Sequence, residues 1–217
     1  MGQFYTSADL GQVNDFTAIT ITERVYVDGK PEYHLRHIER PELGTPYPVI
    51  VERLKELSEK LDGSKTTVID TTGIGRPVFD MMEKARIQGM LYGITITGGQ
   101  DVTREGNIYK VPKIDLISAL QLAFQNGELK IARDLPHAEI LVKELTNFRV
   151  KININANVQF EAVREGIHDD LVLSAAMGVW KASRHVQYSP PPPNYGNDRE
   201  SPWNIGNSRD FMRNCSI

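Results

Sequence analysis

The chain has 217 residues, with 25 Lys and Arg against 28 Asp and Glu, which gives a formal charge of −3 at pH 7. This length suits one compact domain of about 150–200 residues plus an appendage. The one cysteine, Cys215, excludes a disulfide scaffold and a zinc site built on cysteines, and fits a reducing compartment. The near-neutral charge disfavours a domain that binds nucleic acid through an excess of basic residues.

Targeting segments are not recognisable in the sequence. It contains no run of about 18 apolar residues, so we expect no membrane span. The first twenty residues include Asp9 and Asp15, and they lack the basic start and apolar stretch of a secretory signal. We therefore expect a cytosolic protein that is not secreted.

The pattern of the first forty residues predicts an antiparallel meander. Strands are expected at 4–10, 16–27 and 33–38, because these segments are rich in β-branched and aromatic residues. Asp28-Gly29-Lys30 separates the last two, and Asp-Gly is a strong signal for a hairpin turn.

Helices and strands alternate after this meander. Helices are expected over 50–61, 77–88, 114–124, 137–146 and 168–183, and strands over 66–70, 91–97 and 128–132, with a polar loop at 98–107. An auxiliary hairpin is expected from strands 147–154 and 158–162, just before the last helix. The order indicates a mixed α/β sheet.

The periodicity stops near Tyr188, where Pro190 to Pro193 form a polyproline stretch. The sequence therefore predicts a folded domain at 1–187 and a Pro-rich, disordered tail at 188–217.

Carboxylates mark the ends of three expected elements. Asp9 and Asp70 end strands, and Asp169 and Asp170 open the last helix. Taken singly, each is an ordinary turn or helix-cap residue. Together they would converge if the strands are neighbours, and like charges about 4 Å apart repel by about 4 kcal/mol at an effective dielectric of 20.

A divalent cation would compensate this repulsion, since Mg²⁺ and Mn²⁺ prefer carboxylate oxygens. Two such ions clamp the attacking and leaving oxygens of a phosphodiester, so the chemistry indicated is that of a metal-dependent nuclease. Successive helical residues point about 100° apart, and of the Asp pair we expect Asp170 to be the better ligand.

Three motifs carry a family resemblance. They are Ala8-Asp9-Leu10-Gly11 followed by Asp15, Ile69-Asp70-Thr71-Thr72-Gly73-Ile74-Gly75 followed by Arg76-Pro77-Val78, and Gly166-Ile167-His168-Asp169-Asp170-Leu171-Val172 running into a helix of small residues. With them, roughly residues 3–185 resemble the nuclease domain of the large subunit of phage terminases.

The resemblance implies a ribonuclease H-like fold and an endonuclease that cuts concatemeric double-stranded DNA during viral genome packaging. It implies a metal-binding catalytic triad of Asp9, Asp70 and Asp170, with Asp169 as a neighbouring acid and Asp15 and His168 as accessories. The implied cofactor is Mg²⁺ or Mn²⁺, with two ions. The implied partners are DNA, the terminase ATPase domain, the portal and the small terminase subunit, in the cytoplasm of the infected bacterium.

The ATPase motor of such terminases is not expected in this sequence. Gly63-Ser64-Lys65-Thr66 lacks the Gly-Lys pair of a P-loop and follows a helix instead of a strand. We therefore expect an isolated C-terminal domain or, if the chain is complete, a motor on a separate polypeptide.

Candidate DNA-binding residues lie outside the acidic motifs. Arg149 and Lys151 alternate on one face of the auxiliary hairpin, where they either contact phosphates or form a solvated strand face. Arg104 belongs to a loop that either moves onto DNA or is an ordinary connection. Arg76 follows a Gly-Ile-Gly turn, which either approaches a phosphate at a helix N-terminus or is an ordinary tight turn.

Two other functions fit the same residues. One is a Holliday-junction resolvase on the same type of fold, which would prefer four-way junctions to linear duplex. The other is a non-catalytic module that holds a motor to the portal or clamps DNA, with the Pro-rich tail as a tether.

Overall fold

A mixed eight-stranded sheet forms the centre of the computed structural model, with strand order β6-β7-β5-β4-β1-β2-β3-β8. The model describes residues 2–11, 15–152, 158–162 and 169–184, and for 147–152 and 158–162 it describes the backbone alone. The strands are β1 (Gly2–Asp9), β2 (Ala18–Val27), β3 (Lys30–Glu39), β4 (Gly63–Asp70), β5 (Met90–Thr97), β6 (Thr103–Glu105), β7 (Ile108–Pro112) and β8 (Leu129–Ile131), with β9 (Phe148–Ile152) and β10 (Val158–Ala162) paired separately. The helices are α1 (Tyr47–Glu59), α2 (Gly75–Ala85), α3 (Lys113–Gln125), α4 (Ala138–Asn147) and α5 (Asp170–Ser183).

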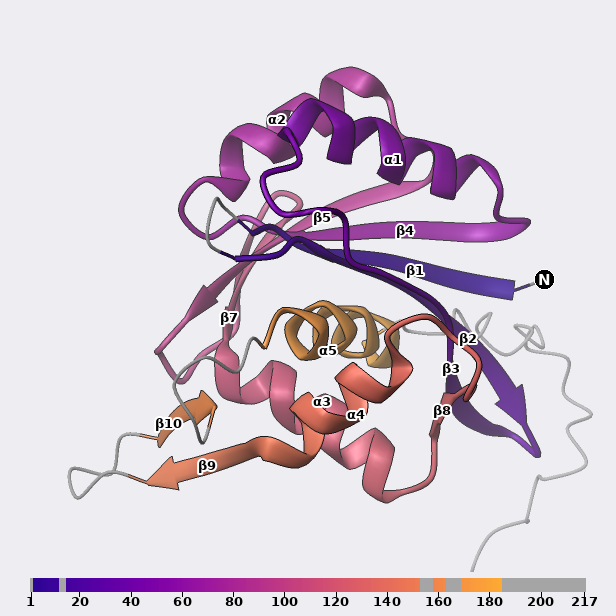
Figure 1. Cartoon of the computed structure of the whole chain (residues 1–217), viewed down its shortest axis with the longest axis vertical. Coiled ribbons are helices and arrows are strands. Elements are labelled where there is room, and N and C mark those ends of the chain that lie inside the picture. Colours follow the sequence, from indigo (N-terminus) through magenta and orange to yellow (C-terminus); the bar gives the residue numbers. More distant parts are fainter. Residues whose placement is uncertain (1, 12–14, 153–157, 163–168, 185–217) are drawn as a thin grey trace, which may run out of the picture. The chain divides into compact units, whose positions relative to one another are not determined.

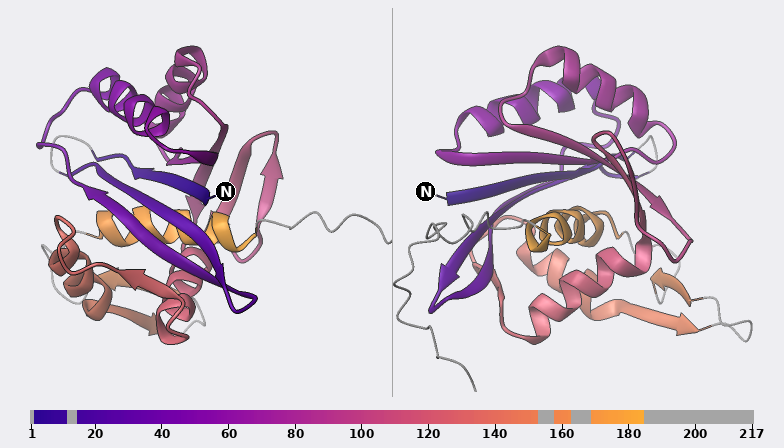
Figure 2. Two further views of the ribbon diagram at one scale, coloured as in Figure 1. Left: turned by 90° about the vertical axis from the view of Figure 1, so that its right-hand side faces the viewer. Right: turned by 180° about the vertical axis from the view of Figure 1, so that it is seen from behind.

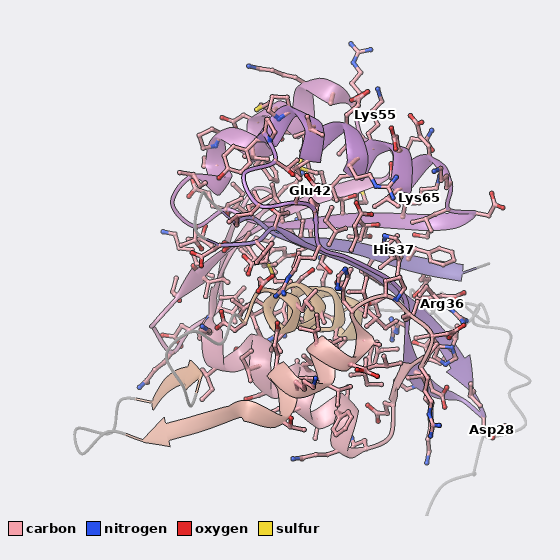
Figure 3. All side chains as sticks on the ribbon, in the orientation of Figure 1. Asp28, Arg36, His37, Glu42, Lys55 and Lys65 are labelled. Carbon is pink, nitrogen blue, oxygen red and sulfur yellow. The ribbon has the colours of Figure 1, made fainter. Side chains whose placement is uncertain are left out.

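The predicted meander is confirmed. β1 pairs antiparallel with β2, and β2 pairs antiparallel with β3. Asp28 and Gly29 connect β2 to β3 with φ of 51° and 77°. Positive φ at both central residues is what a two-residue hairpin with the right twist requires, and Figure 3 shows Asp28 at the tip of this hairpin.

The other half of the sheet is parallel. β1 pairs with β4 with Ala8 opposite Ile69, and β4, β5 and β7 continue in the same direction. The carboxyl ends of these strands therefore meet at one edge of the sheet, which we call the carboxylate edge after the residues described below.

The segment 98–107 was expected to be a loop, and this prediction is wrong for its second part. Thr103–Glu105 forms β6, which pairs antiparallel with β7 around a turn at Gly106, whose φ is 56°. A three-residue strand is too short to show alternation in the sequence, so only the pairing partner reveals it. The resulting hairpin forms one border of the sheet.

Helices cover both faces of the sheet (Figures 1 and 2). α1 and α2 lie over one face, where they bury a cluster that includes Ile19, Leu54, Ile69 and Phe79. α5 lies on the opposite face with α3 and α4 outside it, and Val68 belongs to the core on this side. The neighbours Val68 and Ile69 face opposite cores because side chains alternate along a strand.

α5 approaches the sheet very closely. The Ser174 hydroxyl donates a hydrogen bond to the backbone oxygen of Ser7 at 2.9 Å and lies 3.0 Å from the hydroxyl of Thr20. One turn further on, a Cβ added to Gly178 would lie 2.7 Å from the hydroxyl oxygen of Ser7. The small residues of α5 are therefore a packing requirement of the interface with β1 and β2.

Replacement of Gly178 by Ala should destabilise the fold. The added methyl group would push α5 from β1, and overpacking of this kind costs about 1–3 kcal/mol of unfolding free energy. Urea unfolding followed by circular dichroism measures the change. Gly98→Ala is the matched control, because nothing lies within 4 Å of a Cβ at Gly98. Equal stability of both variants would contradict the packing argument.

The predicted tail at 188–217 lies outside the described residues and stays a prediction. Among the described helices, none has the length and apolar character needed to cross a membrane.

Candidate active site

Asp9 and Asp70 end neighbouring parallel strands. Because Ala8 lies opposite Ile69 in the register of β1 and β4, the next residue of each strand is an aspartate at the carboxylate edge. The backbone N–H of Thr72 donates a hydrogen bond to Oδ1 of Asp70 at 2.7 Å, which fixes this carboxylate at the start of the turn into α2.

α5 brings the other two acids to the same edge. Asp169 occupies the position before the helix, and its side chain makes no capping hydrogen bond there. Instead, Nζ of Lys113 donates a hydrogen bond to Oδ2 of Asp169 at 2.7 Å. Lys113 begins α3 directly after β7, so it reaches the carboxylate edge from a parallel strand as Asp9 and Asp70 do.

Asp170 is held by a different cation. Nε and Nη2 of Arg40 donate hydrogen bonds to its two carboxylate oxygens at 2.8 and 2.6 Å. Nη2 of Arg40 also donates to Glu144 of α4 at 3.0 Å. The first turn of α5 is thereby tied to the end of β3 and to α4.

The charges of these acids act on one another. Burial raises the pKa of Asp9 well above its ordinary value, and the negative charges of Asp70, Asp169 and Asp170 raise it further, while Lys113 lowers it. Burial also raises the pKa of Asp70, against the hydrogen bonds from Thr72 and the charge of Lys113.

The acidic network extends to α4. Burial, followed by the charge of Asp170, raises the pKa of Glu144 to about 7. The charges of neighbouring acids thus raise the pKa of Asp9 and of Glu144, in line with the expected convergence of the acidic motifs.

The donor set suits a hard divalent cation, because it consists of carboxylate oxygens with an excess of negative charge. Among the described residues, however, no three His, Cys, Asp or Glu side chains are already grouped as metal ligands. Arg40 occupies both oxygens of Asp170, and Lys113 occupies an oxygen of Asp169. The ligand set Asp9, Asp70, Asp169 and Asp170 therefore stays a prediction.

The remaining predicted residues fall into three groups. Asp15 is exposed and lines a hollow of about 340 Å³ together with Gly11, beside the turn after β1. Arg76 and Arg104 line a groove of about 750 Å³ between α2 and the β6–β7 hairpin. His168 lies outside the described residues, and the side chains of Arg149 and Lys151 also do.

Two histidines of β3 form local pairs with glutamates. Nε2 of His34 lies 2.7 Å from Glu32, and Nε2 of His37 lies 3.0 Å from Glu39. Figure 3 shows His37 on β3. Both pairs join neighbours two residues apart, on the same side of a strand.

Sequence reasoning missed three residues of this region. Arg40 did carry a signal, since it closely follows the strand expected at 33–38, whereas Lys113 carried none, because β7 was not expected. Glu144 carried no such signal, because a glutamate in an amphipathic helix is usually solvated.

Solved structures with a similar fold include large terminase nuclease domains. The nuclease of the thermophilic phage G20c with bound magnesium aligns with a TM-score of 0.60 and 24% identity, over 82% of this chain and 80% of that chain. This chain has the fold of the large terminase nucleases. The terminase nuclease domain of bacteriophage SPP1 with bound Mn aligns with a TM-score of 0.52 and 9% identity, over 83% of this chain and 86% of that chain.

A third terminase nuclease, the K428A mutant domain of gp2 from bacterial virus Sf6 with manganese and beta-thujaplicinol, aligns with a TM-score of 0.59 and 16% identity. The alignment covers 86% of this chain and 89% of that chain. No family model and no curated protein matches the sequence. The expected mixed α/β terminase nuclease fold is thus confirmed by structure, where sequence similarity is low.

Replacement of Asp9 by Asn should stabilise the metal-free protein at alkaline pH. Because the pKa of Asp9 is raised in the folded state, the folded protein binds this proton more tightly than the unfolded chain. The contribution of protonated Asp9 to the free energy of unfolding is complete below the ordinary pKa of 3.8. It is lost as the pH rises through the folded-state pKa of Asp9. The asparagine side chain carries no charge, so this loss disappears in the variant.

Thermal unfolding in EDTA between pH 4 and pH 8 measures this effect. The difference in midpoint between Asp9→Asn and wild type should grow in favour of the variant as the pH rises. Asp101→Asn, which changes an exposed acid, is the control and should show no such trend. A difference independent of pH would contradict the role of charge at Asp9.

Proposed function

We propose that this chain is a divalent-metal-dependent endonuclease that cuts concatemeric double-stranded DNA during viral genome packaging, as the nuclease part of a terminase large subunit. The observation that carries the proposal is the meeting of Asp9, Asp70 and the start of α5 at the carboxylate edge, on a fold shared with terminase nucleases. The low identity to those proteins makes the site geometry, and not the sequence, the main support.

The proposed cofactor is Mg²⁺ or Mn²⁺, with two ions, and Asp9, Asp70, Asp169 and Asp170 would hold them. Metal ions at such a site stabilise the phosphoryl charge and lower the pKa of a bound water for attack on the phosphodiester. The support comes from the carboxylate donor set and from the relatives solved with magnesium or manganese.

The chain's own residues set the charge and the orientation of the acids at the carboxylate edge. Asp9 holds its proton more tightly than a free aspartate, because it is buried beside other acids. The N–H of Thr72 orients Asp70, and Lys113 supplies a positive charge beside Asp169. A cation with two charges offsets more of the acidic charge than Lys113 alone, which favours its binding here.

A groove on the α2 side of the sheet supports a role in DNA binding for two of the residues proposed from the sequence. The groove between α2 and the β6–β7 hairpin brings together Arg76, Arg104 and Lys110, from segments far apart in the sequence. Arg76 lies in the first turn of α2, shortly after Asp70, so this groove starts next to the carboxylate edge. We propose that it follows the phosphate backbone, with Arg149 and Lys151 as further contacts.

The proposed setting is the cytoplasm of the infected bacterium. There the ATPase motor, the portal and the small terminase subunit would be the partners, and cleavage would be coupled to packaging. Asp15 and His168 are proposed as accessory residues close to the acids in sequence.

Loss of either strand-end acid should abolish catalysis. Asp9→Asn and Asp70→Asn keep the side-chain shape but remove a charge, and we expect cleavage to fall by roughly 100-fold or more. The measurement is cleavage of supercoiled plasmid with Mn²⁺, which EDTA should stop. Asp101→Asn, which changes an exposed acid, should keep full activity.

Two results would contradict the proposed nuclease activity. One is wild-type protein that leaves plasmid intact with either metal. The other is full activity in Asp9→Asn or Asp70→Asn. A strong preference for four-way junctions over linear duplex would redirect the proposal to a junction resolvase.

Removal of the groove cations should weaken DNA binding uniformly over sequences. In the double variant Arg76→Gln, Lys110→Gln, the slope of log affinity against log salt should shrink by about 1 for each phosphate that the protein no longer neutralises. Fluorescence anisotropy with a labelled duplex in EDTA measures the slope without cleavage. Lys30→Gln, at the exposed start of β3, is the control. If the double variant has the same slope as this control, the groove does not contact DNA.

A further inference from the structure

A buried ion cluster includes one of the acids of the carboxylate edge. It consists of Arg40, Glu144 and Asp170, whose side chains are only 12%, 5% and 8% exposed. Arg40 forms a bidentate pair with Asp170 and adds a bond to Glu144. The ring of Phe16 lies 4.8 Å from Cζ of Arg40, so the guanidinium is held on its face as well as on its edge.

Glu144 has a second contact, with the backbone of α5. Its Oε2 accepts a hydrogen bond from the N–H of Val172 at 3.2 Å. The first N–H groups of a helix have no partner within the helix, and Asp169 provides no side-chain cap. Glu144 therefore caps α5 from outside, from α4.

The cluster thus fixes two points of the same helical turn. Arg40 fixes the side chain of Asp170, and Glu144 fixes the backbone of Val172. Because the first turn of a helix is a stiff unit, these contacts also set the place of Asp169, which meets Lys113 at the carboxylate edge.

Stability alone does not explain such a cluster. Burying two acids with one arginine costs desolvation energy, and apolar replacements of buried ion pairs are often as stable. The planar fork of arginine does give directional, bidentate bonds that a lysine cannot reproduce. The cluster is therefore suited to holding a geometry.

We propose that Arg40 and Glu144 are positioning residues that hold the first turn of α5 at the distance from Asp9 and Asp70 that divalent-ion binding requires. The inference rests on the proposed function and deepens it. It assigns to Arg40, at the end of β3, control of metal affinity without contact with the metal or the DNA.

The test replaces Arg40 by Lys in the full chain, which keeps the charge and removes the fork. Partners that orient metal ligands typically change metal affinity by about 10–100-fold, and we expect Mn²⁺ binding to weaken at least about tenfold. Electron paramagnetic resonance of free Mn²⁺ measures the affinity. Plasmid cleavage should show the same shift in half-saturation and recover at high Mn²⁺.

Arg53→Lys is the matched control. Arg53 of α1 also forms a bidentate pair, with Glu39 at 3.0 and 2.8 Å, but α1 lies on the other face of the sheet. We expect its Mn²⁺ affinity to equal that of wild type. If Arg40→Lys does not fold, Glu144→Gln should give a smaller weakening in the same direction.

Two outcomes overturn the inference. A lower unfolding midpoint with unchanged Mn²⁺ affinity would make the cluster merely structural. Tighter Mn²⁺ binding in Arg40→Lys would make Arg40 a competitor of the metal for Asp170.

Amide hydrogen exchange in EDTA separates this inference from the proposed function. The N–H of Val172 should exchange faster in Arg40→Lys than in wild type and Arg53→Lys. If wild type cleaves and binds Mn²⁺ but Arg40→Lys matches it, the inference fails and the nuclease stands. If wild type neither binds Mn²⁺ nor cleaves plasmid, the proposed nuclease function is wrong. In that case, an exchange rate at Val172 that is the same in Arg40→Lys and wild type overturns the positioning role as well.

Discussion

The close packing of α5 on β1 and β2 is the constraint on which the site depends. Ser174 and Gly178 leave room for the helix to touch the backbone and hydroxyls of these strands. This contact places the start of α5 where β1 and β4 end. A larger residue in the interface would move Asp169 and Asp170 away from Asp9, so small residues far from the chemistry determine its geometry.

The second constraint is electrostatic. Burial, and then the charges of the acids around it, raise the pKa of Asp9, so the edge needs positive charge nearby. The protein supplies it from two separate places, Lys113 at the start of α3 and Arg40 after β3. Lys113 pairs with Asp169 and Arg40 pairs with Asp170, so these adjacent acids have different surroundings.

Much of the fold could be predicted from local signals. Strand alternation, the Asp28-Gly29 turn and helical periodicity predicted the meander and the succession of helices, with boundaries shifted by a few residues. β6 and β7 were both missed. Thr103–Glu105 has no pattern of its own and forms a strand only through its pairing with β7. The acids were found because each stands at the end of an element.

The sequence by itself determined most of the elements, their order and the acids at their ends, because these follow from periodicity and turn chemistry within short windows. Only the tertiary structure decided which residues meet. The parallel pairing of β1 with β4, the arrival of Lys113 from β7, and the tie of Arg40 to Asp170, 130 residues away, depend on long-range packing. Contacts of this kind leave no local signal, since their partners are joined by the sheet and not by spacing.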